Sequence, residues 1–218
     1  ASSRFSYKIL SVDGSAQNVQ ILNFNYSKPA IDNSADNDFM KISYSTPLNI
    51  HGSIDMLDKV KPGASGIVIG YDYQVLLDYP DYVKDLAPFT KTFRISELNT
   101  ILAKKTGNIP HDKLDYHVDK IVIVGHSLSR ADDSYFRTIF DTADLYNGKV
   151  VLEYWYTDYP GRDKTLSVET ENLQKINELL MRYIKTSKQV NKDNLLHKLL
   201  LENRLLLREY DINEILQG

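Results

Sequence analysis

The sequence contains no cysteine among its 218 residues. This absence excludes disulfide bonds, thiolate zinc sites and cysteine nucleophiles together. Because disulfides do not persist in a reducing compartment, a chain without cysteine is typical of the cytoplasm. We therefore expect a cytoplasmic protein.

Long apolar runs are also missing. A membrane-spanning helix needs about 20 mainly apolar residues, whereas the longest clean apolar runs are short, such as Ile121 to Val124. We expect neither a membrane helix nor a signal peptide, and so a soluble protein without a membrane partner.

Neither sign of charge dominates the chain. The 26 Lys and Arg residues stand against 29 Asp and Glu residues, which gives a formal net charge of −3. Proteins that bind nucleic acid or anionic membranes through bulk charge carry an excess of positive charge. The composition therefore gives no signal for nucleic-acid binding.

The apolar pattern predicts an α/β fold. Helical patterns at 79–105 and 132–146 alternate with β-prone runs at 19–24, 47–50, 66–70, 120–124 and 150–156. Four successive β-branched residues make 120–124 the clearest strand, of the kind that is buried on both faces of a sheet. A strand, a helix and a strand in this order indicate parallel pairing. We expect one domain over residues 1–166, with a mainly parallel sheet flanked by helices.

Residues 167–218 are predicted to form a C-terminal helical extension. One apolar stripe runs from Leu173 to Ile184, and a second helix carries the leucines between Leu195 and Leu207. This second apolar face is too broad for a lone exposed helix. We expect the leucine-rich helix to pack on the domain or to form a homo-oligomer.

A strand that runs directly into a small polar turn is the strongest local signal for a site. The strand 120–124 is followed by Gly125, His126, Ser127, Leu128 and Ser129. Open α/β sheets bind ligands at the C-terminal ends of their strands. One interpretation is therefore a nucleotide-binding turn, in which backbone N–H groups and Ser127 contact ribose or phosphate.

Two other interpretations of this turn stay open. The nucleophile elbow of a serine hydrolase needs the pattern GxSxG, but Ser129 stands where the second glycine belongs, and the only later histidine is His197. The structural interpretation is a tight turn with Asp132 as the N-cap of the next helix. The pattern favours the binding turn over the hydrolase.

Two further predicted strands end in polar residues. Asn25 follows the first strand, and His51 with Gly52 follows the second. Neighbouring parallel strands would bring Asn25, His51 and Ser127 into one crevice. His126 directly precedes Ser127, so alternation points it to the other side, where it makes a structural contact or a pocket wall.

No metal site is predicted. No pair of histidines has the i, i+4 spacing of a helical metal site, and the carboxylates are not clustered with histidine. Four candidate ligands lie near one another in a loop that we expect to be exposed to solvent: His111, Asp112, Asp115 and His117.

Four short motifs follow one another between Phe24 and Phe136. They are Phe24-Asn25-Tyr26-Ser27, then Ile50-His51-Gly52-Ser53-Ile54-Asp55, then Ile69-Gly70-Tyr71-Asp72, and finally Gly125 to Leu128 with Asp132, Tyr135 and Phe136. In this order they resemble the AbiH family of bacterial abortive-infection proteins, which act in phage defence. The order is also similar to the wider sirtuin-like group of NAD-binding proteins.

The resemblance implies a Rossmann-like (sirtuin/DHS-like) sheet that takes NAD or a related nucleotide as substrate, without a metal. It implies that His51 is the general base toward a ribose hydroxyl or water, and that Asn25 orients the ribose and the attacking group. The reaction would be release of nicotinamide from NAD by hydrolysis. Nucleotide binding would fall to Gly52, Ser53, Gly125, His126, Ser127 and Asp132.

One family motif has no counterpart. The family begins with an Asn-Gly-Phe-Asp-like block on a first strand, and residues 1–19 offer only Asp13 and Gly14. The chain starts at Ala1 without methionine, so the block either lies upstream or does not exist. Two functions therefore stay open: a NAD-consuming defence effector, and a non-catalytic module whose pocket and leucine-rich helix mediate sensing or assembly.

Overall fold

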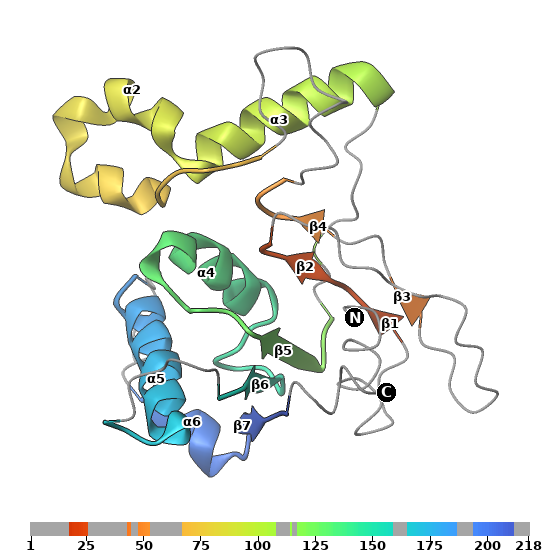
Figure 1. The fold of residues 1–218 in the computed structure, drawn as a ribbon, viewed down its shortest axis with the longest axis vertical. Coiled ribbons are helices and arrows are strands. Elements are labelled where there is room, and N and C mark those ends of the chain that lie inside the picture. Colours follow the sequence, from red (N-terminus) through yellow and green to blue (C-terminus); the bar gives the residue numbers. More distant parts are fainter. Residues whose placement is uncertain are drawn as a thin grey trace. The chain divides into compact units, whose positions relative to one another are not determined.

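The computed structural model describes residues 18–25, 43–44, 48–52, 67–107, 114, 117–158, 165–186 and 194–211. The chain divides into two compact units, unit 1 with residues 1–113 and 214–218, and unit 2 with residues 114–213. Both units combine helices with short parallel sheets, so the predicted α/β class is confirmed (Figure 1).

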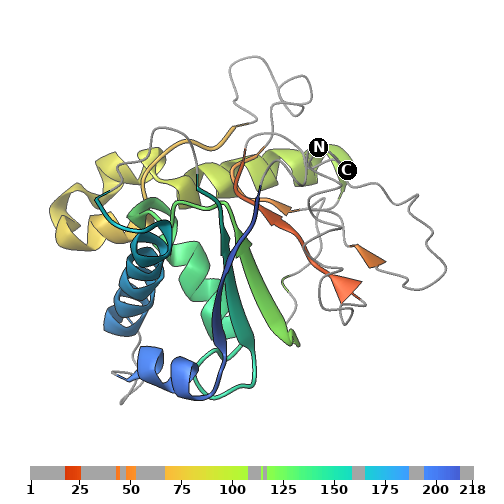
Figure 2. The same cartoon turned by 60° about the horizontal axis from the view of Figure 1, so that its bottom comes forward.

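The sheet of unit 2 has three parallel strands. They are β5 (Lys120–Val124), β6 (Val151–Tyr156) and β7 (Leu205–Glu209), in the order β5-β6-β7. Helix α4 (Asp133–Thr142) connects β5 to β6, and helices α5 (Val168–Thr186) and α6 (Leu195–Leu201) connect β6 to β7. Figure 2 shows the three strands side by side, with α4 and α5 on the same side of the sheet.

The two faces of this sheet differ in chemistry, because successive side chains of a strand point to opposite faces. One face packs Ile123, Leu152, Tyr154 and Leu205 into a single core with Phe136 and Phe140 of α4, Ile176 and Leu180 of α5, and Leu199 of α6. The other face carries Lys120, Glu153, Trp155 and Arg208, which interact with one another. The apolar run Ile121 to Val124 is thus divided between the two faces.

The leucine-rich segment is not one helix. Helix α6 ends at Leu201, Asn203 adopts the left-handed conformation with φ 53°, and Leu205 begins strand β7. The prediction of a helical extension is therefore wrong over Leu205–Glu209. A short apolar run fits a helix or a strand equally well, and here it pairs with the edge of β6, beginning with a 2.7 Å bond from the Leu152 N–H to the Arg204 carbonyl.

The leucines of α6 and β7 differ in burial. Leu195, Leu199 and Leu205 are buried inside unit 2, whereas Leu200 and Leu201 are exposed. The predicted boundary at residue 166 falls inside unit 2. Helices α5 and α6 belong to the same compact unit as β5 and β6, and β7 pairs in the sheet of these two strands. A homo-oligomer through this segment stays a prediction.

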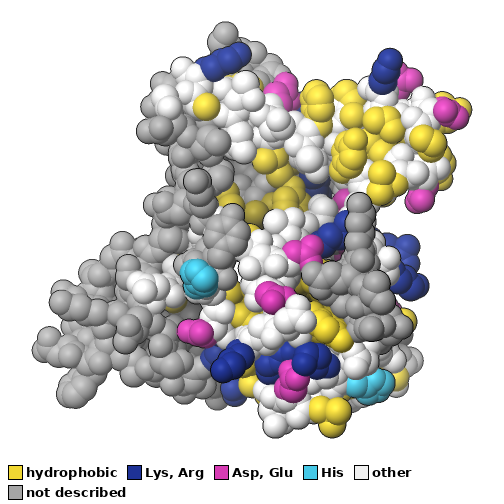
Figure 3. Space-filling model, turned by 180° about the vertical axis from the view of Figure 1, so that it is seen from behind, with side chains coloured by type: hydrophobic (Ala, Val, Ile, Leu, Met, Phe, Trp, Pro, Cys, Tyr) yellow, Lys and Arg dark blue, Asp and Glu magenta, His cyan; other side chains and the backbone are white. Residues whose placement is uncertain are grey.

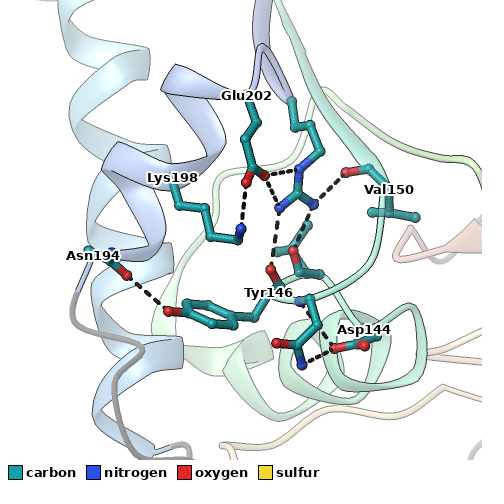
Figure 4. Close-up of polar contacts among 9 residues, drawn as sticks. Asp144, Tyr146, Val150, Asn194, Lys198 and Glu202 are labelled. Atoms are coloured by element: carbon teal, nitrogen blue, oxygen red, sulfur yellow. Dashed lines mark hydrogen bonds and ion pairs between the residues drawn. The ribbon is translucent and has the colours of Figure 1, made fainter.

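The turn from α6 to β7 is held by the guanidinium group of Arg204, which is 6% exposed. Its nitrogens donate to the carbonyl oxygens of Leu145 at 2.9 Å, Val150 at 3.1 Å and Tyr146 at 3.4 Å, and its Nε donates to Glu202 at 2.8 Å (Figure 4). The segment before β6 is therefore fixed to the segment before β7 by one side chain.

Unit 1 contains two short parallel strand pairs. Strand β1 (Asn18–Val19) pairs with β3 (Ser43–Tyr44), and β2 (Leu22–Asn23) pairs with β4 (Leu48–Asn49). The run predicted at 19–24 thus contributes to two short strands, β1 and β2, and the run predicted at 47–50 contains β4. Over its described residues, the run predicted at 66–70 forms one isolated bridge, between Ile67 and Gly52.

Residues 73–106 of unit 1 are mainly helical. Short turns precede one longer helix: η2 (Tyr73–Asp78), η3 (Pro80–Tyr82), α2 (Val83–Leu86), η4 (Ala87–Phe89) and α3 (Lys91–Thr106). The Thr90 hydroxyl caps α3 by accepting from the Phe93 N–H, and Gly107 ends the helix with φ 77°. Ile95, Leu98 and Ile101 of α3 pack with Val68. Among the helices that the structure describes, none combines the length and the apolar character that crossing a bilayer requires.

Candidate functional site

The paired ends of β2 and β4 form a polar cluster in unit 1. The two strands are parallel, with Leu22 opposite Leu48 and Asn23 opposite Asn49. The Asn23 side-chain N–H donates to the Asn49 side-chain oxygen at 2.7 Å, and Asn23 is buried. Because the strands run in the same direction, the residues after Asn23 and Asn49 leave the sheet at the same edge.

His51 is fixed at this edge by its backbone and its ring. It is 5% exposed, and its Nδ1 donates to the Phe24 carbonyl oxygen at 2.9 Å. The ring also packs edge to face against the Phe24 ring, with 5.7 Å between centroids. A carbonyl can only accept, so a neutral ring carries its proton on Nδ1 and its lone pair on Nε2.

Asn25 lies beside His51 on the neighbouring strand end. Its backbone N–H donates to the Asn23 side-chain oxygen at 3.1 Å, which turns the chain out of the strand, and Asn25 is exposed. The structure therefore brings the two predicted catalytic residues to one edge of one strand pair. Their catalytic roles stay predictions.

Gly52 makes the turn after His51. It is buried with φ 72°, and its N–H donates to the Asn49 carbonyl at 3.0 Å. This left-handed conformation costs a glycine little, which explains the residue at this position. Ser53, the next predicted binding residue, lies outside the described residues, as do the motif residues Tyr26, Ser27, Ile54 and Asp55.

The turn after β5 lies in unit 2. Gly125 and Leu128 have positive φ values of 60° and 56°, and between them Ser127 is exposed. The carbonyl groups of this turn are held by side chains: Tyr154 donates to the His126 carbonyl at 2.9 Å, and Arg182 donates to the Leu128 carbonyl at 2.8 Å. The turn is thus a fixed feature at the C-terminal end of a parallel strand, where open α/β sheets bind ligands.

The partly buried His126 and the buried Asp132 form a pair at this turn. The Leu128 N–H donates to Nδ1 of His126 at 2.9 Å, so the neutral ring has its proton on Nε2, which lies 3.4 Å from an Asp132 carboxylate oxygen. Their side chains are only 12% and 8% exposed. Asp132 occupies the predicted N-cap position of α4, but its side chain makes no capping hydrogen bond and faces His126 instead.

The backbone of Ser127 differs from that of a hydrolase nucleophile. A nucleophile elbow holds its serine in a strained conformation, whereas the positive φ values here belong to Gly125 and Leu128. A triad base directs its Nε2 at serine, whereas Nε2 of His126 lies 3.4 Å from Asp132 and its Nδ1 accepts from the Leu128 N–H. His197 is exposed on α6. This geometry favours a binding turn.

The predicted crevice combines residues of both units. Asn25 and His51 belong to unit 1, and Gly125, His126, Ser127 and Asp132 belong to unit 2. The common crevice therefore stays a prediction. Within the described part of the chain, no group of three or more His, Asp or Glu side chains has the arrangement of a metal site. His111, Asp112 and Asp115 lie outside that part.

Several residues of these clusters had no role in the predicted site. Asn23 and Asn49 stand two positions before Asn25 and His51, a spacing that places each pair on one face of a strand. This two-residue spacing is the sequence signal from which the Asn23–Asn49 pair could have been predicted. Arg182 contacts Leu128 across 54 positions of sequence, and nothing in the local pattern indicates it.

Comparisons of the chain with protein-family models, with curated proteins and with solved structures give no match. The resemblance to AbiH proteins therefore depends on the four motifs. Of these, the first two supply Asn25 and His51, and the fourth supplies the turn after β5.

Proposed function

We propose that this protein is a cytoplasmic, AbiH-like phage-defence effector that binds NAD or a related nucleotide and hydrolyses it. The observation that carries the proposal is the placement of Asn25 and His51 after the paired strands β2 and β4, with the His51 ring held through Nδ1. A fixed histidine with its lone pair on Nε2 suits a general base. The proposal includes a Rossmann-like, sirtuin-like arrangement of the strands.

In this reaction, water attacks the anomeric carbon of the ribose that carries nicotinamide. The carbon–oxygen bond forms as the carbon–nitrogen bond breaks, and nicotinamide leaves as a neutral molecule. His51 takes the proton of the attacking water or of a ribose hydroxyl on Nε2 and later returns it to solvent. Asn25 orients the ribose through its amide, which Asn23 positions by accepting from the Asn25 N–H.

The turn after β5 is the proposed nucleotide-holding part. Gly125 has no side chain, so backbone and ligand can approach closely there, and the exposed Ser127 hydroxyl is a donor and acceptor for ribose or phosphate. His126 and Asp132 act beneath this turn by fixing its shape. Their part in binding is therefore positional.

The test is NAD turnover by the purified full chain, measured as nicotinamide released. We expect His51→Ala to lower the rate by about 10²–10⁴-fold, the usual contribution of a general base, and Asn25→Ala to lower it as well. His197→Ala is the matched control, because His197 is exposed on α6. Circular dichroism of each variant shows whether it is folded.

Two outcomes would count against the proposal in different ways. If folded wild-type protein binds NAD or related nucleotides in calorimetry but does not turn them over, the chain is a non-catalytic sensing module. If it neither binds nor hydrolyses any nucleotide tested, the nucleotide function itself is rejected.

A further inference from the structure

Large hydrophobic side chains with high exposure gather in one segment of unit 1. Among the described residues, Leu77 is 71% and Phe89 is 62% exposed. The full set is Ile69, Tyr73, Val75, Leu77, Tyr79, Tyr82, Phe89 and Phe93, here called the 69–93 patch. Figure 3 shows hydrophobic side chains gathered over the part of unit 1 that carries α2. Scattered exposed apolar residues are ordinary, but a contiguous group marks an interaction surface.

The exposure follows from the local fold. Between Tyr73 and Phe89 the chain forms only short helical turns, and of their hydrophobic residues only Leu76 is buried. Val75 and Leu77 flank Leu76 and point elsewhere, because one short turn cannot bury three successive apolar residues on one side. Val83 and Leu86 are partly buried, and the segment presents the exposed apolar side chains of Tyr73, Val75, Leu77, Tyr79, Tyr82 and Phe89.

This segment is also a fixed scaffold. The Asp72 carboxylate caps η2 by accepting from the Gln74 N–H at 2.9 Å, and the Tyr71 hydroxyl donates to the Leu86 carbonyl at 3.2 Å. Thr90 donates to the Ala87 carbonyl at 2.7 Å and is fully buried. A surface that is already ordered loses little conformational entropy when a partner binds.

Acidic side chains border the patch. Asp78, Asp81 and Asp85 are exposed between its apolar residues, and Lys84 is the cation among them. Figure 3 shows acidic side chains at the margin of the hydrophobic area. Anionic membrane surfaces would be repelled by this border. A symmetric contact between two copies would place like charges opposite one another.

The size of the patch fits a segment better than a whole domain. A standard protein–protein interface uses roughly 20–30 residues on each side, whereas the patch offers eight hydrophobic side chains and three carboxylates. A single amphipathic helix uses an apolar row of this extent. Tyrosine and phenylalanine supply large rigid contacts and also attract cations to their ring faces.

We propose that the 69–93 patch is the docking site for a cationic amphipathic helix of a partner protein. The leucine-type side chains of that helix pack on Leu77, Phe89 and their neighbours, and its Lys or Arg residues pair with Asp78, Asp81 and Asp85. This inference is independent of nucleotide chemistry.

The test uses the full chain and a fluorescent probe helix of about 18 residues, or five turns, built from leucine and lysine. A second probe helix, the control, has glutamate in place of lysine. In fluorescence anisotropy, we expect only the lysine helix to bind. The double variant Leu77→Ser, Phe89→Ser and the triple variant Asp78→Lys, Asp81→Lys, Asp85→Lys should each weaken binding at least about tenfold.

Matched controls come from exposed residues of unit 2. Leu201→Ser removes an apolar side chain that is 84% exposed, and Glu178→Lys reverses a side chain that is 72% exposed. Neither should change the affinity. These surface substitutions leave the buried residues intact, and circular dichroism confirms folding.

Four results would overturn the proposal. The first two are that the glutamate helix binds as tightly as the lysine helix, and that the control variants lose as much affinity as the patch variants. The third is that the lysine helix does not bind at concentrations up to about 1 mM. The fourth is that the wild type self-associates in sedimentation and the double variant does not. Binding of the wild type to anionic lipid vesicles, lost in the double variant, would assign the patch to a membrane instead.

Discussion

At the scale of single residues, unit 2 depends on charged side chains that are buried and paired. Glu153 lies on the central strand β6 and is 3% exposed. It accepts from Trp155 at 2.9 Å and lies 3.2 Å from both Lys120 of β5 and Arg208 of β7. One carboxylate therefore links all three strands. Arg204 does the same for the segments that lead into β6 and β7.

The pairing of Glu153 predicts a pH dependence. Burial raises the pKa of this carboxyl, but hydrogen bonds from Trp155, Lys120 and Arg208 outweigh burial and hold the pKa below its ordinary value of 4.5. A lowered folded pKa gives stability that is present above about pH 4.5 and lost as the pH falls through the folded value. We expect Glu153→Gln to lose about 1–3 kcal/mol of unfolding free energy at pH 7.

The measurement is urea unfolding at several pH values between 7 and about 3. The difference between wild type and Glu153→Gln should shrink as the pH falls below 4.5. Glu178→Gln is the matched control, because that side chain is 72% exposed. A difference that stays constant over this range would show that the charge of Glu153 contributes nothing.

At the scale of elements, the decisive feature is the change from helix α6 to strand β7 within one leucine-rich run. The change takes place at Glu202 and Asn203, and the Arg204 N–H donates to the Leu199 carbonyl at 2.7 Å. Asn203 has φ 53°, a conformation that asparagine tolerates better than most residues. A single left-handed residue thus redirects the chain into the sheet.

Substitution of Asn203 tests this role. Asn203→Gly should leave the unfolding free energy within about 0.5 kcal/mol, because glycine adopts positive φ readily. Asn203→Val should lower it by about 1–2 kcal/mol or more, the cost of a left-handed conformation for a residue with a branched Cβ. Thermal unfolding of both variants measures the effect. Equal stability of the two variants would contradict the importance of this conformation.

At the scale of the whole molecule, the chain consists of two units with separate cores. The core of unit 2 draws its buried residues from Ile123 to Leu205, and the smaller core of unit 1 is built around Val68 and Leu98. A compact unit with its own hydrophobic core can fold alone. In unit 2, strands β5 to β7 and helices α4 to α6 all lie between residues 114 and 213.

We therefore expect a fragment of residues 114–213 to fold without unit 1. Circular dichroism should show a cooperative thermal transition. Phe140→Ala within the fragment should lower its stability by about 3–5 kcal/mol, since Phe140 is completely buried. A fragment that unfolds without a cooperative transition would show that unit 2 needs the remainder of the chain.

The candidate site could be predicted in part. The order of strand, asparagine and strand, histidine indicates that Asn25 and His51 end parallel strands, and the structure brings them to one edge. The sequence does not reveal which ring nitrogen of His51 donates, because the acceptor is a backbone carbonyl 27 positions away. The sequence also indicates Asp132 as the N-cap of α4 but not its contact with His126, because that contact depends on the shape of the turn.

The sequence by itself determined the α/β class, the strands at 120–124 and 150–156, and the helices that begin near Asp133 and after Ser167. These follow from apolar periodicity and from residues that start or stop helices, which are local properties of the chain. Only the tertiary structure decided that Leu205 to Leu207 form a strand. Strand β7 pairs with β6, and the core takes the side chains of Leu205 and Leu207; neither partner is adjacent in sequence.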